Sequence, residues 1–242
     1  MRDGVQWDLD LRDDAHRLML LDLYERELRR RALARLPVGG TFVDAGANVG
    51  FWSVPAAQKV GPGGRVVAFE PNPWAVHRLG RNVELNRESL APVEIVAKAL
   101  GDVPGTVDLL ADDLEAGASR ATLYAGAVEA EHPVRVSVPV TTLDEAVHGD
   151  VDLLKMDVQG HELAVLAGGR RLFSESPPTC LVVEVQGELL AHAGVSPEQL
   201  VHACEELGYR AVDGDGRLGH VPVARPLPPE FFETVVFQHA SA

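Results

Sequence analysis

The stretch 41–50 constrains this chain more than any other, because an apolar run leads through an acid into a glycine-rich turn. Phe42 and Val43 are typical of a buried strand, which puts Asp44 at the strand's carboxyl end. Gly46 can adopt backbone angles closed to other residues and lets a ligand approach the main chain. The helix expected next points its free N–H groups back at the turn, which favours a polar or negative ligand group. Ligands of open α/β sheets bind beyond the carboxyl ends of the strands, so this stretch is the first candidate site.

Composition and charge limit the partners that such a chain can have. Its 242 residues, 46% of them hydrophobic, suffice for one sizeable α/β core. The net charge of −14 disfavours nucleic acid or an anionic membrane as the main partner, because both would repel the chain. No apolar run reaches transmembrane length and no signal peptide opens the sequence, so we expect a soluble cytoplasmic protein. Cys180 and Cys204 lie in apolar or helical patterns and predict buried thiols rather than a disulfide or a metal site.

Strands alternate with helices along the chain, which predicts an α/β fold with one doubly wound sheet and helices on both faces. The expected strands are 41–45, 65–70, 93–97, 134–140, 151–157, 180–185, 209–212 and 234–237, with weaker alternation at 106–110. We expect one domain over 1–242, in which 1–37 is a helical flank or lid and 38–242 is the sheet core. Residues 111–133 lack a clear period and predict a loop, and a mobile one is compatible with this composition.

The expected helices are delimited by start and stop signals of unequal strength. They cover 13–36, 50–60, 73–86, a short segment after Asp144, 160–173 and 197–208. Asn72 suits an N-cap before Pro73, and Ser196 with Gln199 forms a full capping box. The run 141–144 is interpreted as a capping box with Asp144 in place of glutamate. The 13–36 helix could form a homodimer contact, but packing on its own domain is preferred and the oligomeric state stays open.

Four acids, Asp44, Glu70, Asp157 and Glu184, each close an expected strand. The carboxyl ends of such strands meet along one edge of the sheet. Glu70 follows Gly50 by 20 residues, the spacing at which an acid reaches the hydroxyls of a bound ribose. Any one of these acids alone could be a surface residue at a strand end without a role in binding. Four acids in register at strand ends favour a nucleoside-binding site.

The turn itself indicates which nucleoside ligand is expected. A dinucleotide fingerprint needs three glycines so that a pyrophosphate can rest on the helix N-terminus. Here Asn48 stands where the second glycine would be, and Phe51 stands where the third would be. A bulkier turn suits a ligand without a pyrophosphate, and S-adenosylmethionine is such a ligand.

Four motifs in chain order then carry a family resemblance. They are FVDAGANVG at 42–50, FEPNP at 69–73, TLD at 142–144 and LKMDVQGHE at 154–162. Together they resemble the FkbM family of S-adenosylmethionine-dependent methyltransferases over roughly residues 38–187. The resemblance implies a Rossmann-like class I methyltransferase sheet of seven mostly parallel strands, the last one antiparallel. Gln159 stands where the family often has glutamate.

The same resemblance implies a set of cofactor-binding residues. Asp44, Gly46 and Asn48 are expected near the methionine part, Glu70 on the ribose and Asp102 near the adenine. Other members of the expected set come from the same motifs: Gly50, Pro71, Asn72 and Asp157. The regions before residue 38 and over 188–230 match only loosely, and acceptor specificity is expected to reside there.

Methyl transfer to a hydroxyl requires alignment of the acceptor oxygen with the activated methyl group. The reaction is faster when a base removes the proton of the hydroxyl. Asp157 and His161 are the candidate catalytic residues, although a histidine in a first helical turn is as often merely exposed. For Lys155 a buried pair with an acid is the favoured interpretation. Asp157, Glu184 and Gln186 offer oxygen ligands that suit Mg²⁺, but without a tight aspartate pair the expectation is no metal.

The leading hypothesis is therefore O-methylation of a small molecule, a sugar or secondary-metabolite hydroxyl. An arginine-rich, lysine-poor composition hints at a GC-rich source and a bacterial natural-product pathway. A nicotinamide-dependent oxidoreductase is one alternative, against which the missing glycines count. A non-catalytic nucleoside-binding protein is the other, against which the intact acids count.

Overall fold

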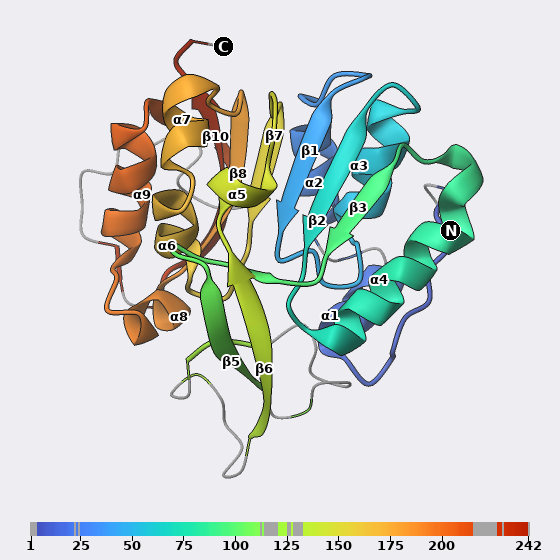
Figure 1. Cartoon of the computed structure of the whole chain (residues 1–242), viewed down its shortest axis with the longest axis horizontal. Helices are drawn as coiled ribbons and strands as arrows, with labels where there is room; N and C mark the ends of the chain where they lie inside the picture. Colours follow the sequence, from blue (N-terminus) through green and yellow to red (C-terminus); the bar gives the residue numbers. More distant parts are fainter. Residues whose placement is uncertain are drawn as a thin grey trace.

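The core of the chain is a seven-stranded sheet with the strand order β3-β2-β1-β7-β8-β10-β9. Its strands are β1 (Thr41–Ala45), β2 (Arg65–Phe69), β3 (Val93–Val96), β7 (Leu153–Met156), β8 (Cys180–Gln186), β9 (Tyr209–Gly214) and β10 (Phe232–His239). Only β10 runs antiparallel to its neighbours, while the other pairs are parallel (Figure 1). The predicted mostly parallel seven-stranded sheet with an antiparallel last strand is thereby confirmed.

This computed structural model describes most of the chain. The described residues are 4–21, 23, 25–111, 113, 121–124, 127, 133–214, 227–228 and 230–241. The loop prediction for 111–133 and the glycine- and proline-rich segment after 214 fall largely outside these residues.

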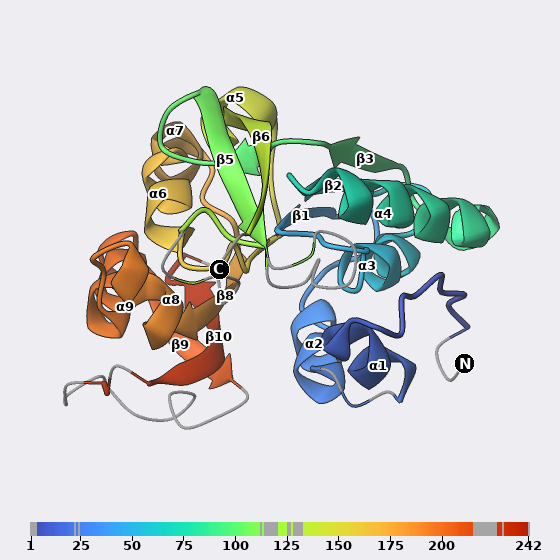
Figure 2. The same ribbon diagram turned by 90° about the horizontal axis from the view of Figure 1, so that it is seen from below.

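Helices cover both faces of the sheet. They are α1 (Asp14–Leu20), α2 (Arg26–Leu33), α3 (Ser53–Val60), α4 (Pro73–Asn86), the 3₁₀ turn η1 (Arg87–Ser89), α5 (Leu143–Ala146), α6 (Glu162–Ala167), α7 (Arg170–Glu175), α8 (Gly187–His192) and α9 (Pro197–Glu206). Neighbouring residues of β1 belong to opposite layers: Phe42 shares a buried cluster with residues of α2 and α3, and Val43 shares another with residues of α6, α7 and α9. Figure 2 shows these two groups of helices on either side of the sheet. The predicted doubly wound arrangement follows from this alternation.

A second, three-stranded sheet stands apart from the first, which corrects the expectation of one sheet. It consists of β4 (Ala99–Leu100), β5 (Gly105–Ala111) and β6 (Val134–Thr141), in the order β4-β6-β5. The valines of β6 do alternate as a strand requires, but β6 pairs with β5 rather than with the main sheet. Alternation identifies a strand without identifying its partner, so the sequence could not assign this one.

The predicted helix over 13–36 is wrong in its continuity. The structure has α1 and α2 instead, and Glu25 lies between them at φ +42°, in the left-handed region. Leu28 and Leu33 of α2 are buried against the sheet, whereas Leu18 and Leu20 of α1 are exposed. The leucine stripe therefore belongs to two helices with different surroundings.

The predicted helix over 160–173 is also two helices, α6 and α7. A Cβ atom at Gly168, between them, would lie 2.1 Å from the carbonyl oxygen of Gly101, so the chain passes too close there for a side chain. Asp144 accepts hydrogen bonds from the N–H groups of Arg171 (2.8 Å) and Leu172 (2.9 Å) and thereby caps α7. The predicted capping box at 141–144 is thus wrong, because Thr142 caps α5 and Asp144 caps another helix.

Other local predictions are confirmed. Asn72 caps α4 with Pro73 at its first position, and both cysteines are buried and free. Helix α8 was not predicted.

The capping box of α9 gives a stability prediction. The Ser196 hydroxyl accepts from the N–H of Gln199, whose side chain accepts from the N–H of Ser196. Ser196→Ala should lower the free energy of unfolding by about 1 kcal/mol. Urea denaturation measures this, with Ser174→Ala at an exposed position of α7 expected within about 0.5 kcal/mol of the parent. Equal effects of the two substitutions would contradict the capping role.

Candidate active site

A cavity of about 630 Å³, counting the space open at its mouth, lies at the carboxyl ends of β1, β2 and β7. The three-stranded sheet and residues 121–123 form its other wall. Its lining residues are Gly46, Asn48, Phe69, Glu70, Pro71, Lys98, Ala99, Leu100, Leu109, Ala121, Thr122, Leu123, Asp157, Val158, Gln159 and His161. Six residues that the sequence nominated are therefore brought together here: Gly46, Asn48, Glu70, Pro71, Asp157 and His161.

The glycine turn is held tightly against β2 and β7. The N–H groups of Gly46 and Ala47 both donate to the carbonyl oxygen of Phe69, at 3.0 and 2.9 Å. Gly46 has φ +79°, and a Cβ atom there would lie 1.8 Å from the carbonyl oxygen of Asp157. Asn48 has φ +47°, and its side-chain Oδ1 is buried without a hydrogen-bond partner. Asn48 thus lines the cavity and has one buried polar atom whose hydrogen-bonding capacity is unused.

Glu70 lies in the cavity wall with both carboxylate oxygens fixed by the backbone. Oε2 accepts from the N–H of Asn48 and Oε1 accepts from the N–H of Asn72, both at 2.8 Å. Each oxygen keeps a lone pair for a further donor. Burial raises the pKa of Glu70 to about 7 against these hydrogen bonds, which lower it.

Behind the turn, Lys155 is the centre of a buried polar network. Its Nζ donates to the carbonyl oxygen of Gly46 (2.9 Å) and lies 3.3 Å from Asp157 Oδ2 and 3.6 Å from Asp44 Oδ1. Burial alone would lower the pKa of Lys155, but Asp157 and Asp44 raise it above its ordinary value. Lys155 therefore stays charged, as the favoured interpretation of a buried lysine–acid pair predicted.

Asp157 and Glu184 are two buried carboxyl groups whose pKa values move in opposite directions. Burial opposes the charge of Asp157, but Lys155 and a hydrogen bond with Glu184 hold its pKa below the ordinary value. Burial and the charge of Asp157 raise the pKa of Glu184 well above its ordinary value. Glu184 is thus the proton-carrying partner. Gln159, at φ +56°, donates to Asp157 Oδ1 at 2.9 Å and completes the group.

His161 lines the cavity at the side of the three-stranded sheet. Its Nδ1 lies 2.7 Å from the hydroxyl of Tyr124, and burial lowers the pKa of the imidazole. A neutral ring with its proton on Nε2 accepts the Tyr124 hydroxyl proton at Nδ1. One ring nitrogen of this candidate base is therefore already engaged.

Four nominated residues do not line the cavity. Asp44 is fully buried and accepts from the Ser53 hydroxyl at 2.6 Å, behind the turn. A Cβ atom at Gly50 would lie 2.7 Å from Leu79 Cδ1, so Gly50 permits close packing on α4. Asn72 caps α4. Asp102 is exposed, near enough to His161 to act on its charge. Two of the four strand-closing acids, Asp44 and Glu184, lie inside their strands rather than at the ends.

Sequence patterns gave no sign of Glu25 or Tyr124. The Glu25 carboxylate accepts from Trp52 Nε1 (3.0 Å) and from the Thr234 hydroxyl (3.1 Å), which brings the N-terminal helices to the Asp157 edge. Burial and the charge of Asp157 raise the pKa of Glu25. Glu25 lies inside the segment predicted as one helix and Tyr124 lies in the segment without a clear period, and the partners of both are distant in sequence.

Within the described residues no three histidine, cysteine or acidic side chains are grouped so that they could hold a metal ion. In the same part of the chain, every helix is too short or too polar to cross a bilayer.

The sequence of this chain is similar to sequences of methyltransferases. Residues 44–211 match the family model described as the methyltransferase FkbM domain. The methyltransferase sdnD of Sordaria araneosa is 31% identical over 164 residues, which are 56% of this chain and 62% of that protein. A probable cobalt-precorrin-6B C(15)-methyltransferase (decarboxylating) of Sulfolobus acidocaldarius is 37% identical over 97 residues, 39% of this chain and 48% of that protein.

A solved structure shares the fold. The methyltransferase FkbM from Methylobacillus flagellatus KT aligns with a TM-score of 0.52 at 16% identity, over 96% of this chain and 56% of that one. The chain thus spans less than two thirds of the length of each of these relatives.

Proposed function

The chain belongs to the methyltransferase FkbM family, and from this premise we propose that it transfers a methyl group from S-adenosylmethionine to a hydroxyl of a small molecule. The observation that carries the proposal is the cavity, which joins the glycine turn, Glu70 and Asp157 at one edge of the sheet. The acceptor is proposed to be a sugar or secondary-metabolite hydroxyl. Residues 1–242 are proposed to work as one domain, with 1–37 flanking the acceptor side.

The residues of the cavity fit S-adenosylmethionine. Glu70 offers two oxygens side by side, which suits a vicinal diol, and the buried Asn48 Oδ1 lacks a hydrogen-bond partner. Leu100, Leu109 and Val158 provide an apolar wall that suits a flat purine. A carboxylate at Asp157 favours a cationic ligand group, whereas it would repel a pyrophosphate. When bound, S-adenosylmethionine supplies a methyl group that its sulfonium has already activated.

The residues of this chain position the acceptor and provide a carboxylate that accepts its proton. The acceptor hydroxyl loses its proton as its oxygen gains the methyl group, and the ionised carboxylate of Asp157, beside Glu184 at the cavity, can accept that proton. We assign the proton-accepting role to Asp157. His161 is assigned to the cavity wall, because its Nδ1 is bound by Tyr124. Positioning contributes much of the rate enhancement in such a reaction.

Binding of S-adenosylmethionine should strengthen as pH rises through about 7. The pKa of Glu70 in the folded chain is about 7, and only its ionised carboxylate accepts hydrogen bonds at both oxygens. Affinity should therefore increase up to about tenfold per pH unit below 7 and level off above it. The folding stability of the chain without ligand depends on pH in the opposite direction. The contribution of Glu70 to the free energy of unfolding is greatest below its unfolded pKa of 4.5 and is lost as the pH rises to about 7.

Isothermal titration calorimetry between about pH 5.5 and 8.5 measures the pH dependence. Glu70→Gln should give a flatter profile. A profile that is level through pH 7 in the parent chain would contradict the assignment of Glu70 to the ribose.

Calorimetry with S-adenosylmethionine and with NAD, side by side, tests the function. Heat with S-adenosylmethionine alone supports the proposal, and methyl transfer from labelled cofactor to a panel of sugars and polyketide alcohols then identifies the acceptor class. Heat with NAD alone would instead favour an oxidoreductase. No heat with either ligand would contradict the proposal.

A further inference from the structure

A segment outside any helix or strand, residues 5–12, lies along helix α4 and is called here the N-terminal strap. Two asparagines of α4 hold its backbone. Asn82 Oδ1 accepts from the N–H of Asp8 (2.6 Å), and Asn82 Nδ2 lies 3.4 Å from the carbonyl oxygen of Asp8. Asn86 bonds in the same reciprocal way to Gln6, with both distances 2.8 Å.

This arrangement works because two spacings agree. Residues four apart on a helix rise about 6 Å along its axis, and alternate residues of an extended chain are about 6.6 Å apart. Asn82 and Asn86 therefore meet Asp8 and Gln6 in register. Each side-chain amide takes the place of a backbone peptide group on a neighbouring strand.

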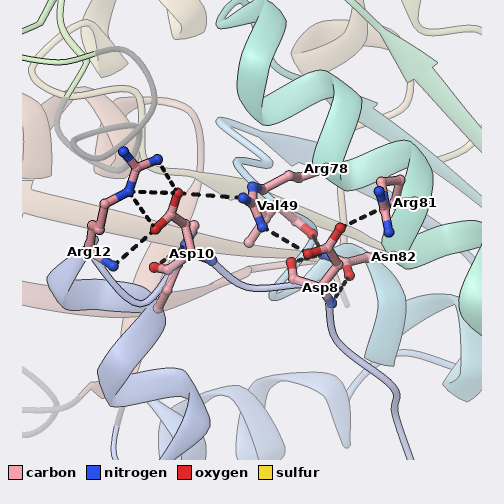
Figure 3. A network of polar contacts seen from close by, with 8 residues as sticks. Asp8, Asp10, Arg12, Val49, Arg78, Arg81 and Asn82 are labelled. Carbon is pink, nitrogen blue, oxygen red and sulfur yellow. Dashed lines mark hydrogen bonds and ion pairs between the residues drawn. The ribbon is translucent and has the colours of Figure 1, made fainter.

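Ion pairs fix the strap further along the same helix (Figure 3). Arg78 lies 2.9 Å from Asp8 Oδ1 and 3.4 Å from Asp10 Oδ2, and Arg81 lies 2.6 Å from Asp8 Oδ2. Arg78 also lies over the ring of Trp74, which stacks on buried His16 of α1. The strap and the helix that follows it are thus attached to one face of α4.

Asn82 has a second role that Asn86 lacks. Its Nδ2 donates to the carbonyl oxygen of Val49 at 2.8 Å, and the side chain is fully buried. Val49 follows Asn48, a cavity-lining residue whose N–H donates to Glu70 and whose buried Oδ1 has no hydrogen-bond partner. Asn86 donates instead to Gln6 and to the carbonyl oxygen of Asn82. One amide therefore joins the strap to the glycine turn.

We propose that Asn82 is a positioning residue for the glycine turn, and that the N-terminal strap holds Asn82 in the orientation that the turn requires. The proposal rests on the proposed function, because it takes the turn to be the seat of S-adenosylmethionine. Without the Asn82 amide, the Val49 carbonyl has no donor to fix its peptide plane. Asn48 would then lose the geometry that places its N–H on Glu70.

A matched pair of variants tests this. Asn82→Asp keeps an oxygen for the N–H of Asp8 but removes the donor to the glycine turn at Val49. Asn86→Asp removes the donor to Gln6 and to the backbone carbonyl of Asn82, and it removes no donor to the turn. Asn82→Asp should weaken S-adenosylmethionine binding about tenfold by calorimetry, while Asn86→Asp stays within about twofold of the parent. Both variants should unfold at lower temperature than the parent, so stability alone cannot explain a difference in affinity.

Equal affinities of the parent and Asn82→Asp would overturn the proposal, and so would equal weakening by both variants. If Asn82→Asp does not fold, hydrogen exchange of the parent chain tests whether the strap and the glycine turn respond together to ligand binding. S-adenosylmethionine should then protect the amides of residues 6–8 together with those of the turn. Protection confined to the turn would overturn the proposal. A parent chain that binds no S-adenosylmethionine contradicts the proposed function instead.

Discussion

Replacing Gly46 with alanine is expected to abolish S-adenosylmethionine binding and to lower the free energy of unfolding by about 3 kcal/mol or more. A Cβ atom at this position would lie 1.8 Å from the carbonyl oxygen of Asp157, a backbone atom that cannot rotate away. Alanine would also be strained at φ +79°. Relief requires the turn after β1 to move from the end of β7, and this opens the cavity between Asn48 and Asp157.

Calorimetry and chemical denaturation measure the two effects. Gly61→Ala is the matched control, because Gly61 also has positive φ, at +66°, but has nothing within 4 Å of an added Cβ atom. It should show the cost of backbone strain alone, about 1 kcal/mol, and unchanged binding. If Gly46→Ala binds S-adenosylmethionine as Gly61→Ala does, the turn is not the cofactor seat.

Removing the charge of Glu70 should weaken S-adenosylmethionine binding by an order of magnitude or more. Hydrogen bonds to a charged group contribute roughly 1.5–3 kcal/mol, which is about 10- to 100-fold in affinity. Glu70→Gln keeps the shape but turns an NH₂ group toward the N–H of Asn48 or of Asn72, both of which need an acceptor. Glu70→Ala leaves both N–H groups without their partner and should weaken binding at least as much.

Calorimetry at about pH 8, above the pKa of Glu70, gives the full difference. Glu94→Gln is a suitable control, since Glu94 is an exposed acid on the neighbouring strand β3. It should bind as the parent does. Unchanged affinity in Glu70→Gln would remove Glu70 from the site.

The parts of the site that the sequence predicted depend on local chemistry. Phe42 and Val43 indicate a strand by their apolarity, Gly46 indicates a positive φ, and Glu70 follows its strand directly. The carboxyl ends of parallel strands meet by geometry, so these residues could be placed together without knowledge of any distant contact.

The parts that were missed depend on contacts between distant segments. Asp144 looks like a cap for its own helix, yet it caps α7 across 27 residues. Gly168 interrupts a helical pattern because the carbonyl of Gly101 passes beside it. Tyr124 reaches His161 across 37 residues and Glu25 reaches Thr234 across 209. Periodicity within a window carries no information about such partners.

The two walls of the cavity differ in what else they support. The wall from β1, β2 and β7 is continuous with the buried layers of the main sheet, so a change there alters the whole fold. The other wall, from β4, β5 and residues 121–123, packs mainly on a separate small cluster around Ala99, Leu109 and Val138, and only Leu100 of β4 belongs to the main core. Substitutions at Leu109 or Leu123 can therefore reshape the ligand space at little cost to the main core. Engineering of this protein toward larger or smaller ligands has its natural starting point at Leu109 and Leu123 in that wall.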